Sequence, residues 1–209
     1  MNNMAQEGFF SKAETTSISR PDGKKLTCAS CLRYQQCKTP RFKPQGNGKK
    51  KILNIFELPS TEDDKTGKFL QSKSGRLLTK TYKGLGIDVM EDCLNVYSLA
   101  CYSDSPYNPH NIDCCRRFVL QAIQDYQPLV IVLFGTVSLQ SVIGHRWKRD
   151  LGGINKWRGW TIPDQDFGCW VCPVFSPEYV ERSFGEFDKI TAENTVWVND
   201  LKQIINLVV

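Results

Sequence analysis

The sequence predicts an α/β domain in which helices cover both faces of a four-stranded parallel sheet, a three-layer α/β/α architecture. Strand-like runs alternate with segments of helical spacing from residue 52 onward, an order typical of parallel βα units. The run LVIVLF at 129–134 is apolar throughout, as expected of a strand covered on both faces. The chain has 209 residues, of which 41% are hydrophobic, so it is long enough for one domain with its own core.

The four strand-like runs lie at 52–57, 94–100, 129–134 and 169–175. Segments with helical spacing lie at 75–85, 112–126, 137–143 and 193–207. In the last segment, Trp197, Leu201, Ile204 and Ile205 fall on one face, which predicts that this face packs against the core. The elements therefore predict a single domain over residues 25–209, preceded by a polar tail over residues 1–24 that has no periodicity.

The first part of this domain, residues 25–51, combines cysteines with two prolines, two glycines and a lysine run. This composition favours irregular structure held by a bound metal centre over a helix or a strand. Residues 1–51 carry eleven Lys and Arg against three Asp and Glu, a net charge of +8, whereas the rest of the chain has −3. Lys49, Lys50 and Lys51 are the best candidates for contacts with phosphate, and a solvated tail is the equal alternative.

Nine cysteines, an odd number, argue against a disulfide framework and favour metal or cluster ligation. Two CxxC pairs, Cys28/Cys31 and Cys169/Cys172, are the first candidates. No apolar run approaches membrane-spanning length, and the first ten residues lack the order of a signal peptide. We therefore expect a soluble protein of the cytoplasm, a reducing intracellular compartment, with no membrane partner.

Four positions follow the four predicted strands, namely Glu57, Cys101, Gly135 and Ser176. In an open parallel sheet, ligands bind beyond the carboxyl ends of the strands. We expect these four positions to converge on one rim of the sheet, with Glu57 as its carboxylate.

The segments CASC, FELPS, EDDKTG, GKFLQSKSG, YSLAC, VLFG and SPEYV follow one another along residues 28–179. No single segment is specific, but the ordered set resembles the uracil-DNA glycosylase superfamily, particularly its iron–sulfur branch, family 4. The resemblance implies the fold described above and DNA as a partner. It also implies that Glu57 is the carboxylate that stabilises the cationic sugar-like state during cleavage of the bond between base and deoxyribose.

The resemblance further implies a [4Fe–4S] cluster bound by Cys28, Cys31, Cys101 and Cys115. Cys115 is preferred to its neighbour Cys114 because family members place this ligand thirteen residues before the proline that opens the third strand, here Pro128. The other cysteines are then packed thiols. A zinc site built from both CxxC pairs is the rival, although residues three apart on a strand point to opposite faces.

Several pocket positions depart from the family pattern. Phe56 and Phe69 replace a glycine and a proline, and Leu70 replaces the phenylalanine that stacks on the base. Tyr97 stands where an asparagine reads the uracil edge, and Ser176 stands where a histidine stabilises the departing base. Loss of one preorganised donor of this kind costs about 3 kcal/mol, or at least about a hundredfold in rate.

Two functions remain open on this reading. One is a DNA-binding scaffold or accessory subunit that excises uracil poorly, with a protein partner in a replication or defence assembly. The other is an active DNA N-glycosylase that removes uracil or another modified base through Glu57. The segment INKWRGW resembles a family loop near the DNA, so Arg158 is a candidate phosphate contact, with an ordinary surface arginine as the equal alternative. His110 and His145 are expected to be ordinary surface or loop residues.

Overall fold

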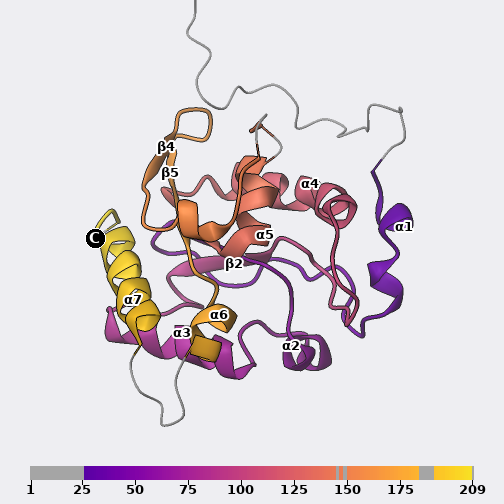
Figure 1. The fold of residues 1–209 in the computed structure, drawn as a ribbon, viewed down its shortest axis with the longest axis horizontal. Coiled ribbons are helices and arrows are strands. Elements are labelled where there is room, and N and C mark those ends of the chain that lie inside the picture. The colour runs from indigo at the N-terminus through magenta and orange to yellow at the C-terminus, as the bar shows by residue number, and fades with distance from the viewer. Residues whose placement is uncertain (1–25, 145, 148–149, 184–190, 209) are drawn as a thin grey trace, which may run out of the picture.

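We describe a computed structural model over residues 26–144, 146–147, 150–183 and 191–208. The expected tail at 1–24 and His145 lie outside these residues. The chain forms a five-stranded sheet in the order β2-β1-β3-β5-β4 (Figure 1). Its four parallel strands are β1 (Ile52–Phe56), β2 (Cys93–Tyr97), β3 (Val130–Phe134) and β5 (Cys169–Val174). The expected four-stranded parallel sheet is therefore confirmed.

The fifth strand, β4 (Ile162–Asp164), pairs antiparallel with β5 at the edge of the sheet. Sequence analysis missed it because it has three residues and contains Pro163, which lowers the strand signal. Pro163 is tolerated because β4 is an edge strand and needs ladder hydrogen bonds on one side only. The predicted sheet is correct apart from this short addition.

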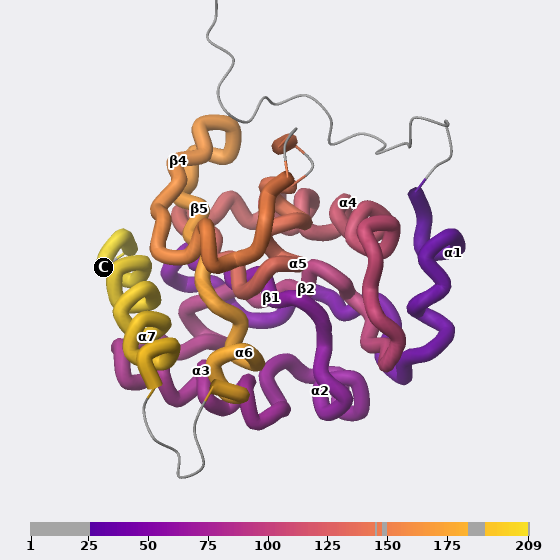
Figure 2. Tube along the Cα trace, in the orientation of Figure 1, coloured from indigo at the N-terminus to yellow at the C-terminus, as the bar shows by residue number. Residues whose placement is uncertain are grey.

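Helices cover both faces of the sheet, which gives the expected three layers (Figure 2). Helices α3 (Lys73–Gly84), α6 (Pro177–Ser183) and α7 (Ala192–Ile205) pack on one face. Helices α4 (Pro109–Tyr126) and α5 (Gly135–Leu139) pack on the other, together with a π-helical turn at Gln140–Gly144. The four residues predicted to form the inner face of α7 are all buried.

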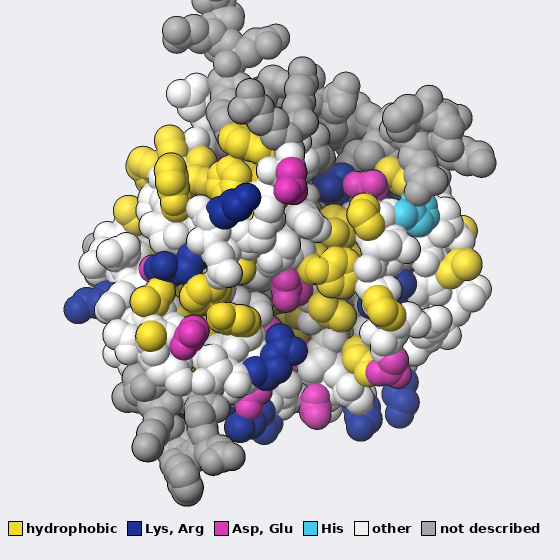
Figure 3. Space-filling model, in the orientation of Figure 1, with side chains coloured by type: hydrophobic (Ala, Val, Ile, Leu, Met, Phe, Trp, Pro, Cys, Tyr) yellow, Lys and Arg dark blue, Asp and Glu magenta, His cyan; other side chains and the backbone are white. Residues whose placement is uncertain are grey.

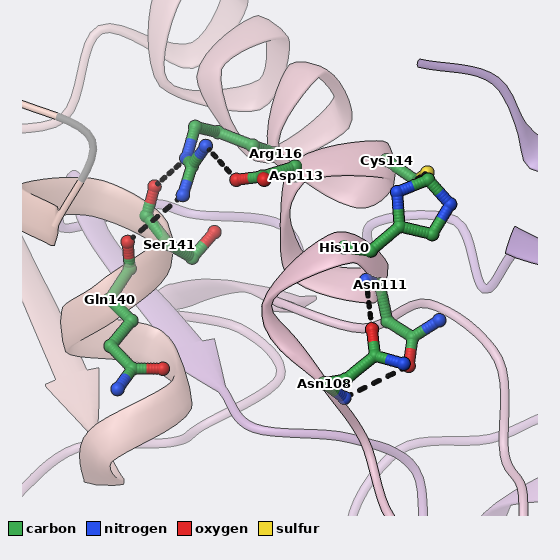
Figure 4. Close-up of polar contacts among 8 residues, drawn as sticks. All are labelled: Asn108, His110, Asn111, Asp113, Cys114, Arg116, Gln140 and Ser141. Atoms are coloured by element: carbon green, nitrogen blue, oxygen red, sulfur yellow. Dashed lines mark hydrogen bonds and ion pairs between the residues drawn. The ribbon is translucent and has the colours of Figure 1, made fainter. Parts of the chain in front are cut away.

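Arg116 fastens α4 to the π-helical turn (Figure 4). Its guanidinium donates to the carbonyl oxygens of Ser141 at 2.9 Å and Gln140 at 3.3 Å, and it pairs with Asp113 at 2.6 Å. An unpaired buried guanidinium would be costly, so these acceptors explain how Arg116 can be buried. The π-helical turn thus leaves two carbonyl groups free to hold the arginine.

Three short helices were not expected: α1 (Cys28–Cys31), α2 (Thr61–Thr66) and α6. Each has seven residues or fewer, too short for an amphipathic period to show. Helix α2 forms because Ser60 and Asp63 make a capping box, in which each side chain accepts from the other residue's backbone N–H. No helix in the described part of the chain is long and apolar enough to cross a membrane.

Candidate active site and cysteine cavity

Glu57 lies directly after β1, at the carboxyl end of the sheet, where it meets the start of α5. The backbone N–H of Val137 donates to Glu57 Oε1 at 3.0 Å. Gly135 has a φ of +84°, and a Cβ there would lie 2.4 Å from Glu57 Cδ. A glycine therefore follows β3 directly, because only a residue without a side chain lets the carboxylate approach this closely.

The surroundings of Glu57 alter its ionisation. Burial raises the pKa of Glu57 to about 6, and the nearby charge of Glu178 acts in the same direction. The N–H groups of Val137 and Thr136 and the charge of Arg182 act in the opposite direction. A carboxylate with this pKa is mostly ionised at neutral pH, the form needed to stabilise a developing positive charge.

Two of the expected pocket residues stack on each other. Tyr97, at the end of β2, stacks on Phe69 with ring centroids 4.2 Å apart and planes 5° from parallel. Phe42 meets both rings edge to face, at 5.4 Å from Tyr97 and 5.6 Å from Phe69. Tyr97 and Phe69 are 5% and 3% exposed, so the stack is closed to solvent.

Asp63 fixes this closed arrangement. Its carboxylate accepts from the hydroxyl of Tyr97 at 2.9 Å, from the Gln71 N–H at 2.7 Å and from the Ser60 N–H at 3.0 Å. Asp63 is itself buried, so its charge depends on these three donors. Burial, followed by the charge of Asp63, raises the pKa of Tyr97, which keeps the phenol protonated as the donor.

The other expected pocket residues pack in the core, line another groove or cap a helix. Phe56 is buried and stacks on Phe134, with centroids 4.8 Å apart. Leu70 takes a left-handed backbone conformation with φ of 62° and lines a separate groove beside α3. Ser176 is buried at the start of α6, where its hydroxyl accepts from the Tyr179 N–H at 3.2 Å. Ser176 thus acts as a helix cap.

The four expected ligand cysteines line one small cavity between α1, α4 and the segment after β2. Two backbone or side-chain amides donate to them: Arg41 N–H to Cys101 Sγ at 3.3 Å, and Asn111 Nδ2 to Cys31 Sγ at 3.4 Å. Among the described residues, no three His, Cys, Asp or Glu side chains are placed to hold one metal ion. A four-iron cluster takes one thiolate per iron, so its ligands lie farther apart than those around one ion, and this cavity fits that donor set.

Cys114 and Cys115 both line the cavity, and both are buried. Burial, with smaller contributions from the nearby Cys31, Cys101 and Cys28, raises the pKa of Cys115 to about 12. Cys114 instead contacts Ser30 Oγ at 3.5 Å. It also lies beside His110, whose Nε2 is 3.6 Å from the Cys114 sulfur (Figure 4). His110 also contacts the Ser30 carbonyl oxygen at 3.0 Å, and it lies in the first turn of α4, so it is a helix residue and not a loop residue.

The zinc site built from both CxxC pairs does not form. Cys169 packs in the core between the sheet and α4, whereas Cys172 packs in the core on the other face of the sheet. The two side chains therefore point apart, as expected for strand residues three apart. Cys93 is also a buried core residue.

The lysine run expected to contact phosphate lies far from Glu57. Lys49, Lys50 and Lys51 precede β1, so the full length of a five-residue strand, about 17 Å, separates them from Glu57. Lys49 pairs with Glu91 at 2.6 Å, and Lys51 donates to the Tyr126 carbonyl oxygen at 2.9 Å. The structure therefore does not bring the lysine run to the rim that carries Glu57.

Arg158, by contrast, lies on that rim. Its guanidinium makes a two-point contact with Asp200 of α7, at 2.9 and 2.6 Å, and lies 5.5 Å from the ring centroid of Phe175. Phe175 precedes Ser176 at the end of β5. The loop that contains Arg158 is therefore fixed between the rim and the last helix.

Sequence reasoning missed the roles of three residues: Asp63 beside Tyr97, and Tyr107 and Glu178 near Glu57. The Ser60–Asp63 spacing is a capping-box signal that pointed to Asp63. Tyr107 is half exposed. Its pKa is raised first by burial and second by the charge of Glu57, so Tyr107 lies near that carboxylate. Glu178 accepts from the hydroxyl of Ser74 at 3.1 Å. Neither Tyr107 nor Glu178 had a local signal, because their roles come from tertiary contacts.

Comparison with known proteins is consistent with this geometry. A sequence model of the uracil DNA glycosylase superfamily matches residues 43–202. The Type-4 uracil-DNA glycosylase of Thermotoga maritima is 31% identical over 141 residues, which cover 66% of this chain and 70% of that protein. The Type-4 uracil-DNA glycosylase of Saccharolobus solfataricus is 26% identical over 168 residues, which cover 75% of this chain and 76% of that protein.

Proposed function

Because the chain belongs to the uracil DNA glycosylase superfamily, we propose that it is a DNA-binding iron–sulfur protein that keeps this fold and does not excise uracil efficiently. It would then act as a scaffold or accessory subunit in an assembly on DNA. The observation that carries the proposal is the Tyr97–Phe69 stack, because it occupies the space that a flipped base needs.

Opening this pocket would be costly. A base could enter only if the Tyr97 ring left Phe69 and its hydroxyl left Asp63, so that a buried carboxylate lost a donor. Leaving such a group unsatisfied costs about 1–3 kcal/mol before the lost ring contacts are counted. Ser176 adds to the argument, since its hydroxyl is engaged as a helix cap.

The cluster part of the proposal rests on the cysteine cavity. Cys28, Cys31, Cys101 and Cys115 would hold a [4Fe–4S] cluster, whose contribution is to tie the N-terminal segment to α4 and to the end of β2. The N–H groups of Arg41 and Asn111 would stabilise the thiolate charge.

One observation favours the alternative, an active N-glycosylase for another base. Glu57 keeps the family position and a contact to the Val137 N–H, and its pKa of about 6 leaves it ionised at neutral pH. If the protein is active, its rate should rise with pH up to about 6 and then level, because only the ionised carboxylate stabilises the sugar cation.

The test is strand cleavage after alkaline treatment, on single- and double-stranded oligonucleotides that carry uracil or another modified base, with Glu57→Gln as the control. We expect no more abasic sites from the parent protein than from the variant, together with retained DNA binding. Abasic sites made on uracil by the parent alone would contradict the proposal, and such sites on another base alone would establish the alternative.

A further inference from the structure

A second hollow lies beside the edge strand β4, outside the base pocket. It is a groove of about 660 Å³ with mostly apolar walls, and its lining includes Trp147, Leu151, Lys156, Trp157, Trp160 and Ile162. Trp157 is held by a hydrogen bond from its indole N–H to the Leu151 carbonyl oxygen at 2.8 Å, and Trp147 meets it edge to face at 5.2 Å. Trp160 is 64% exposed, so one indole in the groove is presented to solvent.

The loop that supplies most of the groove lining is anchored to the rim that carries Glu57. The Ile154 N–H donates to Thr136 Oγ1 at 3.3 Å, and Thr136 is one of the residues whose N–H acts on Glu57. On the other side, the Gly159 N–H donates to the Pro173 carbonyl oxygen at 3.1 Å, near the end of β5. Figure 3 shows apolar side chains gathered at this corner, over β4 and β5.

Positive charge accompanies the indoles. Lys156 is the cation of the groove lining, whereas Arg158, which follows Trp157 in the chain, is paired with Asp200. The Lys156 side chain lies against Gly152, whose φ is +70° and where an added Cβ would come within 2.9 Å of the Lys156 Nζ. Asp150 is the one carboxylate in the described lining. Flat aromatic faces beside cations are the combination that binds bases joined by phosphates.

We propose that this groove binds unpaired bases of single-stranded DNA, by stacking on Trp160 with Lys156 against the adjoining phosphate. Bases of a duplex are already stacked on their neighbours, so only a single strand offers a free base face to the indole. The inference rests on the proposed DNA binding and extends it to the kind of strand. With the base pocket filled by Tyr97, the groove supplies the base contact that the pocket does not.

The test measures dissociation constants by fluorescence anisotropy for three ligands of equal length: a thymine-only strand, an abasic strand with the same backbone, and a duplex. The variants are Trp160→Ala and Trp170→Ala. Trp170 is the matched control, since it is a 41% exposed tryptophan of β5 that does not line the groove. We expect Trp160→Ala to weaken the thymine strand about tenfold, as typical for one stacked base, and to leave the abasic strand nearly unchanged.

Salt dependence separates stacking from charge. Trp160→Ala should leave the slope of log affinity against log salt unchanged, whereas Lys156→Ala should reduce it by about 0.7, the value for one phosphate contact on a single strand. Equal weakening of all three ligands by Trp160→Ala, or no weakening of the thymine strand, would overturn the inference and leave a peptide as the better occupant. If the parent protein binds none of the three ligands at low salt, the proposed DNA binding fails as well.

Discussion

Glu57 and Tyr97 lie at the carboxyl ends of the neighbouring strands β1 and β2. The two residues have opposite consequences for chemistry. Glu57 has the position and the ionisation of a catalytic carboxylate, because the start of α5 reaches it with N–H groups. Under the proposed function, Tyr97 would close the space in which a substrate base would meet that carboxylate, because its ring lies on Phe69. The retained carboxylate is therefore not sufficient evidence of activity.

The raised pKa of Glu57 predicts how pH affects stability. The folded-state pKa, about 6, lies above the usual value of 4.5, so folding disfavours the ionised form. This carboxyl group's contribution to the free energy of unfolding is full below pH 4.5 and falls as pH rises to about 6. Glu57→Gln, which keeps an acceptor for the Val137 N–H, should therefore have a higher urea midpoint than the parent at pH 8. The gap should close at pH 4.5, and a gap that is constant across this range would contradict the prediction.

Tyr97→Phe tests the lock on the pocket. The change removes the donor to Asp63 and keeps the ring, so we expect a loss of about 1–3 kcal/mol in the free energy of unfolding, measured in urea. Tyr102→Phe is the control, because that hydroxyl bonds to Thr61 and Asp104 in a more exposed setting. Similar losses in both variants would show that the Asp63 contact has no special weight.

The elements show how far the sequence predicts this structure. The four parallel strands and helices α3, α4 and α7 were predictable, since their apolar periods extend over five or more residues. Helix α2 was not, because TEDDKT is polar throughout and is stabilised by its cap and by tertiary contacts. Asp64 of α2 accepts from the Lys38 N–H at 2.9 Å and the Thr39 N–H at 2.8 Å, a contact between distant segments that no local pattern encodes. For the site, the position of Glu57 could be read from the end of its strand, but the closed stack depends on how Tyr97 and Phe69 pack together.

The junction of β3 and α5 gives a prediction at this scale. Gly135→Ala and Gly168→Ala both place an alanine at positive φ, which costs about 1–2 kcal/mol in either case. Gly168 has no atom within 4 Å of an added Cβ, whereas Gly135 faces Glu57. Gly135→Ala should therefore lower the free energy of unfolding by clearly more than Gly168→Ala does, as measured by urea titration. Equal losses would mean that Glu57 moves aside at little cost.

At the scale of the whole molecule, the N-terminal segment is attached at three kinds of site. Gln45 pairs with Asn95 beside β2, the Phe42 N–H donates to the Ala100 carbonyl oxygen at 2.7 Å, and the cysteines meet in their cavity. The proposed cluster would close the largest loop in the chain, from Cys28 to Cys115, and so restrict the unfolded state.

Cys101→Ser should therefore remove the cluster and lower stability, while Cys172→Ser should keep the iron. Cys172 is a buried core cysteine away from the cavity and serves as the matched control. Purified parent protein and the Cys172 variant should show broad absorbance near 400 nm and about four irons per chain. Equal iron content in Cys101→Ser and the parent, or zinc without iron in the parent, would contradict the assignment.

The hydrogen bond between Tyr97 and Asp63 also bears on whether this pocket can be reversed to a base-binding form. Tyr97→Asn alone would restore the family's base reader but leave the buried Asp63 short of a donor and the stack short of a ring. Because Tyr97 and Asp63 are in contact, the effects of substituting each on the free energy of unfolding should not add. Both residues would have to change before a substitution at either is well tolerated. A return to a base-binding pocket would therefore begin with a substitution, such as Tyr97→Asn, that lowers the stability of the fold before it can provide any activity.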